Sequence, residues 1–401
     1  MHHSNRSEID SPRAWVMAGT AFVTCFVVFG VVYSFGAFFK PMAVQFGASR
    51  SNTSAVFSIT ASLYNLLGIA GGHLADRFGP RRVVIAGALA MGAGLIATSC
   101  IDRLWIGYVT YGLGVGIGVA CTYVPMLAMV GGWFVRRRNT ALGLAASGIG
   151  AGALAVAPLA AVLIQRYGWR TAYAILGVTS AVMLIGCGLT AEAAPVASAR
   201  GHLHLSRAVR TPNFIMLYVA SILSSIAIYM PFVFLPDFAH SHGASQVGAA
   251  ALVGFIGAAS IAGRLALGAI ADRTGIIGLY KASMLLLGLS YGLWIFSHSY
   301  AVLVLFAITM GAAYGGMIAL SPAVVAELFG VRGLGAMLGA LYTGSSISAL
   351  SGPPLAGFII DRTGNYLWAA ILGGATGIIG FLILVPLGAG LSLEAPLAES
   401  D

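Results

Sequence analysis

The stretch GGHLADRFGPRR at residues 71–82 recurs as LGAIADRTGIIG at residues 267–278, which is 196 positions further along the chain. The same offset of 196 relates four places in the two parts of the sequence. The aligned pairs are Asp76 and Asp272, Arg77 and Arg273, QRYG at 165–168 and DRTG at 361–364, Gly143 and Gly339, and Tyr33 and Tyr229. Because one offset seldom fits four places by chance, we interpret it as an internal repeat that predicts two halves of similar fold.

The composition predicts an integral membrane protein of the all-α class. The 401 residues are 59% hydrophobic and only 8% charged, with a mean hydropathy of +0.92, whereas soluble domains carry about 25% charged residues. The 54 glycines suit closely packed transmembrane helices. A formal net charge of +9 would favour nucleic acid as the partner of a soluble domain. In a membrane protein basic residues instead mark the cytoplasmic loops, so we expect no nucleic-acid partner.

Apolar runs of roughly 20 residues, the length that spans a bilayer, alternate with charged or turn-rich breaks. They predict twelve transmembrane helices. The segments are residues 15–39, 52–75, 83–101, 104–131, 141–165, 170–190, 213–238, 247–271, 280–298, 301–326, 335–360 and 367–389. The first run is followed by FFKP rather than by a small-residue cleavage site, so we expect it to remain as the first helix.

The basic residues also predict the orientation. With the N-terminus assigned to the cytoplasm, 14 Lys and Arg residues fall inside and 6 outside, and Arg264 completes the total of 21. This bias predicts that both termini are cytoplasmic in the cell (inner) membrane. The longest break, residues 191–212, is polar, basic and central. We therefore expect a six-helix bundle over residues 1–190, a cytoplasmic linker over 191–212 and a second six-helix bundle over 213–401.

The repeated motif resembles the loop signature between helices 2 and 3 of the major facilitator superfamily, apart from an extra Pro80 before its two arginines. The matching residues are Gly72, Leu74, Ala75, Asp76, Arg77, Gly79, Arg81 and Arg82. With the twelve spans and the internal repeat, this resemblance covers nearly the whole chain. It implies two pseudosymmetric bundles that rock about a central site, as in secondary transporters.

Within that superfamily, WFVRRRNTALGLAASGIGAG at 133–152 resembles the helix 4 to 5 signature of the monocarboxylate transporter family, which includes relatives that exchange oxalate and formate. Residues 327–364 resemble the family's helix 10 to 11 region, and Arg264 matches its helix 8 arginine. The resemblance is to a bacterial member and implies symport of protons with small monocarboxylates such as lactate or pyruvate. Ser260 and Tyr33 stand where animal members have an acidic residue and a lysine, so those groups of the animal proton relay are absent here.

Arg264 lies in the otherwise uncharged run GFIGAASIAGRLALGAI at 254–270. A guanidinium at the centre of a membrane helix costs about 2.5 to 3.5 kcal/mol and does not lose its proton, so it needs a partner. All twelve acidic residues fall in loops, tails or helix ends. We therefore expect the carboxylate of a substrate to pair with Arg264. The alternative is an arginine that reaches the membrane interface or is held by backbone carbonyls.

Aromatic hydroxyls are the predicted second ligands, because four tyrosines lie away from the ends of helices that line the cavity in the superfamily. They are Tyr33, Tyr123, Tyr314 and Tyr342, and Ser260 and Asn65 are further candidates. A membrane tyrosine often serves only as an interfacial anchor, but these four lie too deep for that role. We therefore expect them to contact the substrate together with Arg264.

The charged residues of the repeated motif are predicted to act in gating rather than in substrate binding. They are Asp76, Arg77, Arg81 and Arg82 in the first half, and Asp272 and Arg273 in the second. Asp76 is expected to pair with arginines and to face a helix N-terminus of the other half, which would close the inner side. The alternative is that these charges only set the topology.

The sequence thus predicts a twelve-helix secondary transporter that works as a monomer in the lipid bilayer and carries a small monocarboxylate anion with a proton. Since no carboxylate lies in the membrane core, proton uptake is expected to depend on the substrate and Arg264, through Tyr33 or water. Because no cluster of nucleophile, base or metal ligands is evident, we expect neither an enzyme nor a metal or other cofactor. The alternatives are an organic-anion exchanger, a drug-efflux transporter and a membrane sensor that binds acids without moving them.

Overall fold

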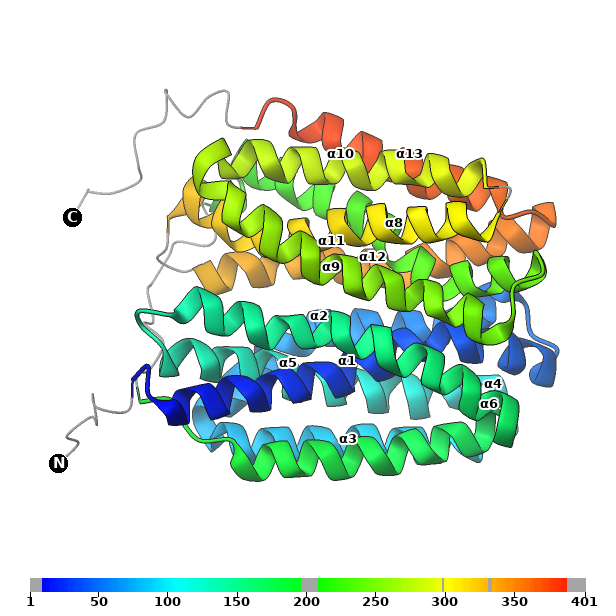
Figure 1. Ribbon diagram of the computed structural model, residues 1–401, viewed down its shortest axis with the longest axis horizontal. Coiled ribbons are helices and arrows are strands. Elements are labelled where there is room, and N and C mark those ends of the chain that lie inside the picture. The colour runs from blue at the N-terminus through cyan, green and yellow to red at the C-terminus, as the bar shows by residue number, and fades with distance from the viewer. Residues whose placement is uncertain (1–8, 196–207, 298, 331–333, 388–401) are drawn as a thin grey trace.

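The computed structural model describes residues 9–195, 208–297, 299–330 and 334–387, and all regular elements within these ranges are helices (Figure 1). In chain order the helices are α1 (Pro12–Phe46), α2 (Arg50–Phe78), α3 (Pro80–Ser99), α4 (Leu104–Gly107), η2 (Tyr108–Leu113), α5 (Gly114–Trp133), α6 (Arg138–Thr190), α8 (Pro212–Ser241), α9 (Gln246–Thr274), α10 (Ile276–Ile295), α11 (Tyr300–Phe329), α12 (Leu334–Thr363) and α13 (Leu367–Leu384). Most of the predicted linker, residues 196–207, lies outside the described residues. The helices α1–α6 are called the first half below, and α8–α13 the second half.

The helices provide the twelve predicted membrane crossings. Ten helical stretches of the described chain are long and apolar enough to cross a membrane, and α4, η2 and α5 together form one of them. The 53 residues of α6 provide two crossings, because the backbone leaves the helical region at Gly168, with φ 79° and ψ 160°. The remaining crossing is α12. It has 30 residues, but Ser, Thr and Pro side chains interrupt its apolar sequence. The predicted all-α membrane fold is therefore confirmed.

The internal repeat is present in the helix boundaries. The bounds of α2, α3 and the α4–α5 stretch recur 196 residues later as those of α9, α10 and α11. Three glycines with positive φ also recur at this offset: Gly47, Gly79 and Gly168 correspond to Gly243, Gly275 and Gly364. Glycine ends helices at such positions because other residues adopt positive φ only at a cost. The predicted repeat is therefore a repeat of local structure as well as of sequence.

Two antiparallel helix pairs join the halves, α2 with α12 and the first limb of α6 with α9. Small residues let these backbones approach each other. A Cβ atom at Gly357 of α12 would lie 2.7 Å from the backbone nitrogen of Ser51 in α2. In the second pair, Gly150 of α6 lies against the carbonyl of Gly257 in α9. The helix that carries Arg264 is thus part of the interface between the halves.

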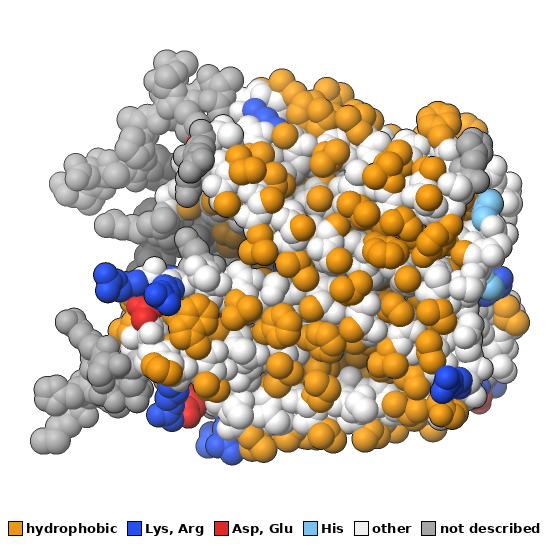
Figure 2. Space-filling view, in the orientation of Figure 1, with side chains coloured by type: hydrophobic (Ala, Val, Ile, Leu, Met, Phe, Trp, Pro, Cys, Tyr) orange, Lys and Arg blue, Asp and Glu red, His pale blue; other side chains and the backbone are white. Residues whose placement is uncertain are grey.

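The helices lie roughly along one common axis, up and down in alternation, so the molecule has two ends (Figure 1). α1 begins and α13 ends at the same end, here called the proximal end; the opposite end is called the distal end (Figure 1). In the view of Figure 2, hydrophobic side chains cover much of the surface between the ends, and charged side chains gather towards the two ends. This distribution suits a helix bundle whose middle crosses the hydrocarbon of a bilayer.

Candidate binding site between the two halves

Arg264 is a buried cation at the interface between the halves. It lies 18 residues after the distal start of α9, which is about 27 Å along the helix, and only 8% of it is exposed. Its Nη1 atom donates a hydrogen bond to the carbonyl oxygen of Ala146 in α6 at 2.6 Å. Its Nε and Nη2 atoms are buried without a hydrogen-bond partner. The guanidinium therefore bridges the halves and keeps two donors unsatisfied.

No carboxylate pairs with Arg264 in the described part of the chain. The groups within electrostatic reach of its charge include Tyr33, Tyr123, Tyr314 and Cys25, none of which is an acid of the Asp or Glu type. Unsatisfied buried donors are costly, and most so when they carry a charge. Of the described backbone carbonyls that could hold this arginine, only that of Ala146 accepts a hydrogen bond from it. The remaining donors suit an anion with two oxygens.

Tyr33 of α1 and Tyr314 of α11 meet across the interface, with their hydroxyl oxygens 2.9 Å apart. The ring of Tyr33 also stacks on Phe232 of α8, with ring centroids 4.0 Å apart. Tyr314 lies 14 residues from the distal start of α11, about 21 Å along that helix. This is roughly one helical turn closer to the distal end than Arg264. The tyrosine pair therefore forms a layer between Arg264 and the distal end.

A second contact across the interface is centred on Tyr229 of α8. Asn65 of α2 donates to the Tyr229 hydroxyl at 2.8 Å, and the Tyr64 hydroxyl donates to it at 3.4 Å. Tyr229 is the repeat counterpart of Tyr33, so each half sends an equivalent tyrosine to the other. The two tyrosines align in the sequence repeat, but Tyr229 was not predicted as a site residue. The recurrence at offset 196 was the signal that could have identified it.

The other predicted ligands have different surroundings. The ring centroid of Tyr123 lies 4.9 Å from that of Phe29, in an edge-to-face arrangement. Tyr342 of α12 is 39% exposed. Ser260 was predicted to lie one turn from Arg264 on the same face, and it is buried. Its hydroxyl donates to the carbonyl of Gly257 at 2.9 Å, so this donor is already used within α9.

The distal end is fastened by charged contacts between the halves. Asp237 of α8 is only 6% exposed, accepts a hydrogen bond from Tyr366, and lies 3.5 Å from the guanidinium of Arg50 in α2. Asp361 of α12 accepts hydrogen bonds from the backbone nitrogens of Arg50 and Ser51, at 3.2 and 3.1 Å. This carboxylate therefore satisfies two free N–H groups at the start of α2, where the helix dipole also favours negative charge. We call Arg50, Asp237 and Asp361 the distal gate.

This gate was not predicted from the sequence. Arg50 was one of the basic residues used as topology markers, and Asp237 was one of the acids placed in loops, tails or helix ends. Asp237 does lie near the end of α8, but it is buried and paired instead of solvated. A carboxylate directly after an apolar run and a proline was the available signal, and its partner could not be identified from sequence.

The gate residues predicted from the repeated motif lie at the proximal end. Asp76 and Arg77 end α2, and Arg81 and Arg82 begin α3, all with exposed side chains. Within the described residues the three arginines form no ion pair, and Arg77 lies over the ring of Phe78 at 5.3 Å. The side chains of Asp272 and Arg273 lie outside the described residues. At the distal end, Asp361 makes a contact of the kind expected of Asp76, a carboxylate on a helix N-terminus of the other half.

The fold of two repeated halves agrees with the comparison against known families. The family model of the Major Facilitator Superfamily matches residues 21–293 and 277–396, which together are most of the chain. This protein therefore belongs to the major facilitator superfamily.

Within the superfamily, the chain is 32% identical over 379 residues to monocarboxylate transporter 3 of Rattus norvegicus, covering 89% of this chain and 76% of that protein. It is 29% identical over 397 residues to monocarboxylate transporter 13 of Bos taurus, covering 97% of this chain and 93% of that protein. These relatives place it in the monocarboxylate transporter family. The predicted membership is confirmed, and the protein is a transporter of this family rather than an enzyme.

Two solved structures share the fold. A peptide transporter called POT, in complex with sulfate, superposes with a TM-score of 0.73 at 17% identity, covering 92% of this chain and 94% of that chain. A bacterial homologue of the human lysosomal transporter Spinster superposes with a TM-score of 0.68 at 16% identity, covering 94% of this chain and 95% of that chain. At these identities the likeness concerns the fold alone.

Proposed function

We propose that this protein moves small monocarboxylates, such as lactate or pyruvate, across a membrane by alternating access. The observation that carries the proposal is Arg264, a buried cation between the halves with two unsatisfied donors. A carboxylate has two oxygens that a guanidinium can bind side by side, so it satisfies the charge and both donors at once. The names of the relatives, monocarboxylate transporters of rat and cattle, support the same substrate class.

The surroundings of Arg264 favour a small substrate with a single negative charge. One guanidinium neutralises one carboxylate, and a dicarboxylate would bring a second charge without a partner. Tyr314 lies roughly one helical turn nearer the distal end than Arg264, and its hydroxyl and that of Tyr33 can donate to a substrate oxygen once their mutual hydrogen bond opens. Tyr123, Tyr342 and Asn65 are proposed as further contacts, because they lie on helices that meet at the interface.

The transport step is proposed as a rocking of two bundles, residues 1–190 and 213–401, joined by the linker 191–212. In one state the distal gate is closed, as in this structure; in the other it opens and the proximal residues Asp76, Arg77, Arg81 and Arg82 draw the halves together. Asp272 and Arg273 are assigned the same role by the repeat. We take the proximal end to be cytoplasmic, the membrane to be the cell membrane and the monomer to be the working unit.

Proton symport is proposed as the coupling. No carboxylate contacts Arg264 within the described residues. This part of the chain therefore offers no Asp or Glu side chain next to this cation that could bind the transported proton. We therefore expect the proton to travel with the substrate, through Tyr33 or water. An exchanger of organic anions is the competing mechanism, and it differs in one respect: it requires a counter-anion and no proton gradient.

The test is uptake of labelled lactate into proteoliposomes that contain the purified protein, with and without an inward proton gradient. Symport predicts that the gradient increases uptake, whereas exchange predicts uptake that depends only on lactate inside the vesicle. Arg264→Ala should raise the half-saturating lactate concentration at least about tenfold, since charged hydrogen bonds are lost. Arg264→Lys should recover little, because an ammonium lacks the two-pronged geometry.

The matched control for these variants is Arg103→Ala, which removes an exposed arginine at the start of α4. It should leave lactate uptake unchanged. Unaltered lactate affinity in Arg264→Ala would refute the assignment of Arg264 as the anion anchor.

A further inference from the structure

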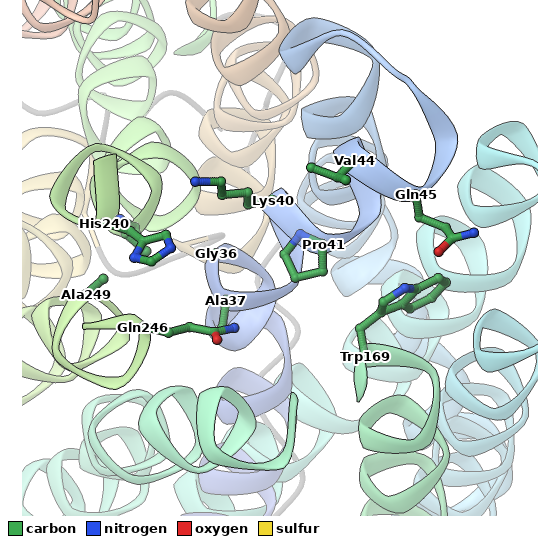
Figure 3. A pocket seen from close by; sticks show the side chains of 11 residues that line it. Gly36, Ala37, Lys40, Pro41, Val44, Gln45, Trp169, His240, Gln246 and Ala249 are labelled. Carbon is green, nitrogen blue, oxygen red and sulfur yellow. The ribbon is translucent and has the colours of Figure 1, made fainter. Parts of the chain in front are cut away.

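A pocket of about 300 Å³ lies at the distal end, away from Arg264. Its walls come from both halves: the end of α1 and the break in α6 on one side, and the end of α8 and the start of α9 on the other (Figure 3). Gln246, which lines it, is 18 residues from Arg264 along α9, or about 27 Å. The pocket is therefore distinct from the central site.

The polar groups of this pocket suit an anion. Lys40 lines it, and in the described part of the chain its ammonium group has no ion pair and no hydrogen bond to protein. His240 donates from Nδ1 to the carbonyl oxygen of Ala244 at 2.9 Å, which fixes the ring in the pocket wall. The side-chain amide of Gln246 adds a donor from α9. None of the lining residues is acidic.

The rest of the pocket suits a flat apolar body. In Figure 3, Lys40 and His240 lie on one side of the pocket and Trp169 on the other. Pro41 and Pro236 also line it. Trp169 is only 7% exposed, and with the two prolines it forms an apolar wall along which the edge of a ring can pack. The volume is at the lower limit for ligand pockets, which run from about 300 to 1,000 Å³, so the ligand is small.

The position of the pocket gives its ligand a mechanical effect. Lys40 belongs to the first half, whereas His240 and Gln246 belong to the second. The distal gate holds these walls together in the present state. Rocking of the halves to open the distal end separates the walls and dismantles the pocket. A ligand that binds only the state with the distal end closed shifts the population towards it.

We propose that this pocket is a regulatory site for a small aromatic monocarboxylate, which contacts both halves and holds the distal end closed. The ligand carboxylate pairs with Lys40 and accepts from Gln246, and its ring packs near Trp169. Bound from the distal side, such an acid inhibits transport without competing with the substrate at Arg264. The inhibitory effect rests on the proposed transport function, but binding to the pocket does not.

Binding of labelled benzoate to the purified protein tests the site, with benzamide as its uncharged counterpart. The Arg264→Ala variant removes the anion anchor of the central site and should retain one benzoate site. Lys40→Gln in that background should weaken the remaining binding about tenfold, because a charged hydrogen bond is lost. Lys40 is exposed, so its substitution is compatible with folding. Benzoate affinity unchanged by Lys40→Gln, or benzamide binding as tight as benzoate, would overturn the proposal.

The conformational effect is tested with spin labels at Asp102→Cys and His242→Cys, two exposed distal positions in opposite halves. In the spin-labelled variants, the four native cysteines are first replaced by serine so that only the two introduced cysteines react with the label. Benzoate should increase the population with the short, closed distance between the labels, and Lys40→Gln should abolish this shift. A longer distance with benzoate contradicts the proposal. If binding depends on Lys40 while lactate is not transported, only the transport function fails.

Discussion

The two ends of the molecule are held together by different kinds of polar contact. At the distal end, Arg50 of the first half pairs with Asp237 and Asp361 of the second, at 3.5 and 3.7 Å. These contacts cross the interface between the halves, and Asp361 also satisfies the start of α2. Opening of the distal end must therefore break them.

At the proximal end, the described polar contacts of the first half do not reach the second half: they lie within the first half or join it to the start of the linker at Glu192. Arg13 pairs with Glu192 at 2.6 Å, and the carboxylate of Asp10 accepts from the backbone nitrogens of Arg136 and Arg137, at 3.0 and 3.3 Å. Such contacts stabilise one half and can persist while the halves move relative to each other. The distal contacts therefore report the conformational state, whereas these proximal contacts report the integrity of the first half.

Removal of Arg50 should produce the largest change. Arg50→Ala leaves Asp237 buried without its cation, and loss of one partner of a buried pair costs about 3 to 5 kcal/mol. The side chain of Arg50 is 40% exposed, so we expect about 2 kcal/mol, enough to shift the population towards an open distal end. The distance between spin labels at Asp102 and His242 should lengthen. Arg13→Ala is the matched control, and an equal lengthening in that variant would contradict the comparison.

A wedge in the helix interface should produce a smaller change. Gly357→Ala places a methyl group 2.7 Å from the backbone nitrogen of Ser51, and overpacking of this kind costs about 1 to 3 kcal/mol. Because Ser51 lies in α2 next to the distal gate, the distal end should again open in part. Gly335→Ala on the same helix is the control, since its Cβ meets nothing within 4 Å. Identical label distances in the two variants would contradict the prediction, because they would show that α2 and α12 accommodate the methyl group by a local shift without movement of the halves.

The smallest effect is expected at the proximal end, from Asp10→Asn. Hydrogen bonds from the backbone of Arg136 and its neighbours lower the pKa of the Asp10 carboxyl below the usual 3.8. The folded protein is therefore stabilised by the ionised carboxylate above that value, and this contribution is lost as pH falls through the lower pKa of the folded state. Thermal unfolding should show a slightly lower Tm for the variant at pH 7 and no difference at strongly acidic pH. The distal label distance should not change.

Local signals in the sequence accounted for the fold. Apolar run lengths identified the twelve crossings, and the offset of 196 anticipated the matched helix bounds of the two halves. The glycine at each break, such as Gly79 or Gly275, reflects a backbone preference that a single residue determines. The deep position of Arg264 was evident for the same reason, because the cost of a charge in an apolar run depends on the run itself.

The candidate site was predictable only in part. The sequence supplied Arg264 and its lack of an acidic partner in the membrane core, but not the hydrogen bond to Ala146 or the pairing of Tyr33 with Tyr314. Ser260 was placed near Arg264 by helical spacing, yet its hydroxyl bonds within its own helix. Spacing gives the face of a helix, whereas the partner on that face depends on which helix packs there.

A membrane protein of two repeated halves, with the cation Arg264 deep in an apolar run, could be predicted from the sequence alone. These properties follow from hydropathy, turn chemistry and charge, which act over short distances along the chain. Only the tertiary structure decided that Arg50 meets Asp361, 311 residues away, and that Lys40 and Gln246 share a pocket. Such contacts arise from the packing of helices that are remote in sequence, so the end at which the halves are fastened could be known only once the halves were assembled.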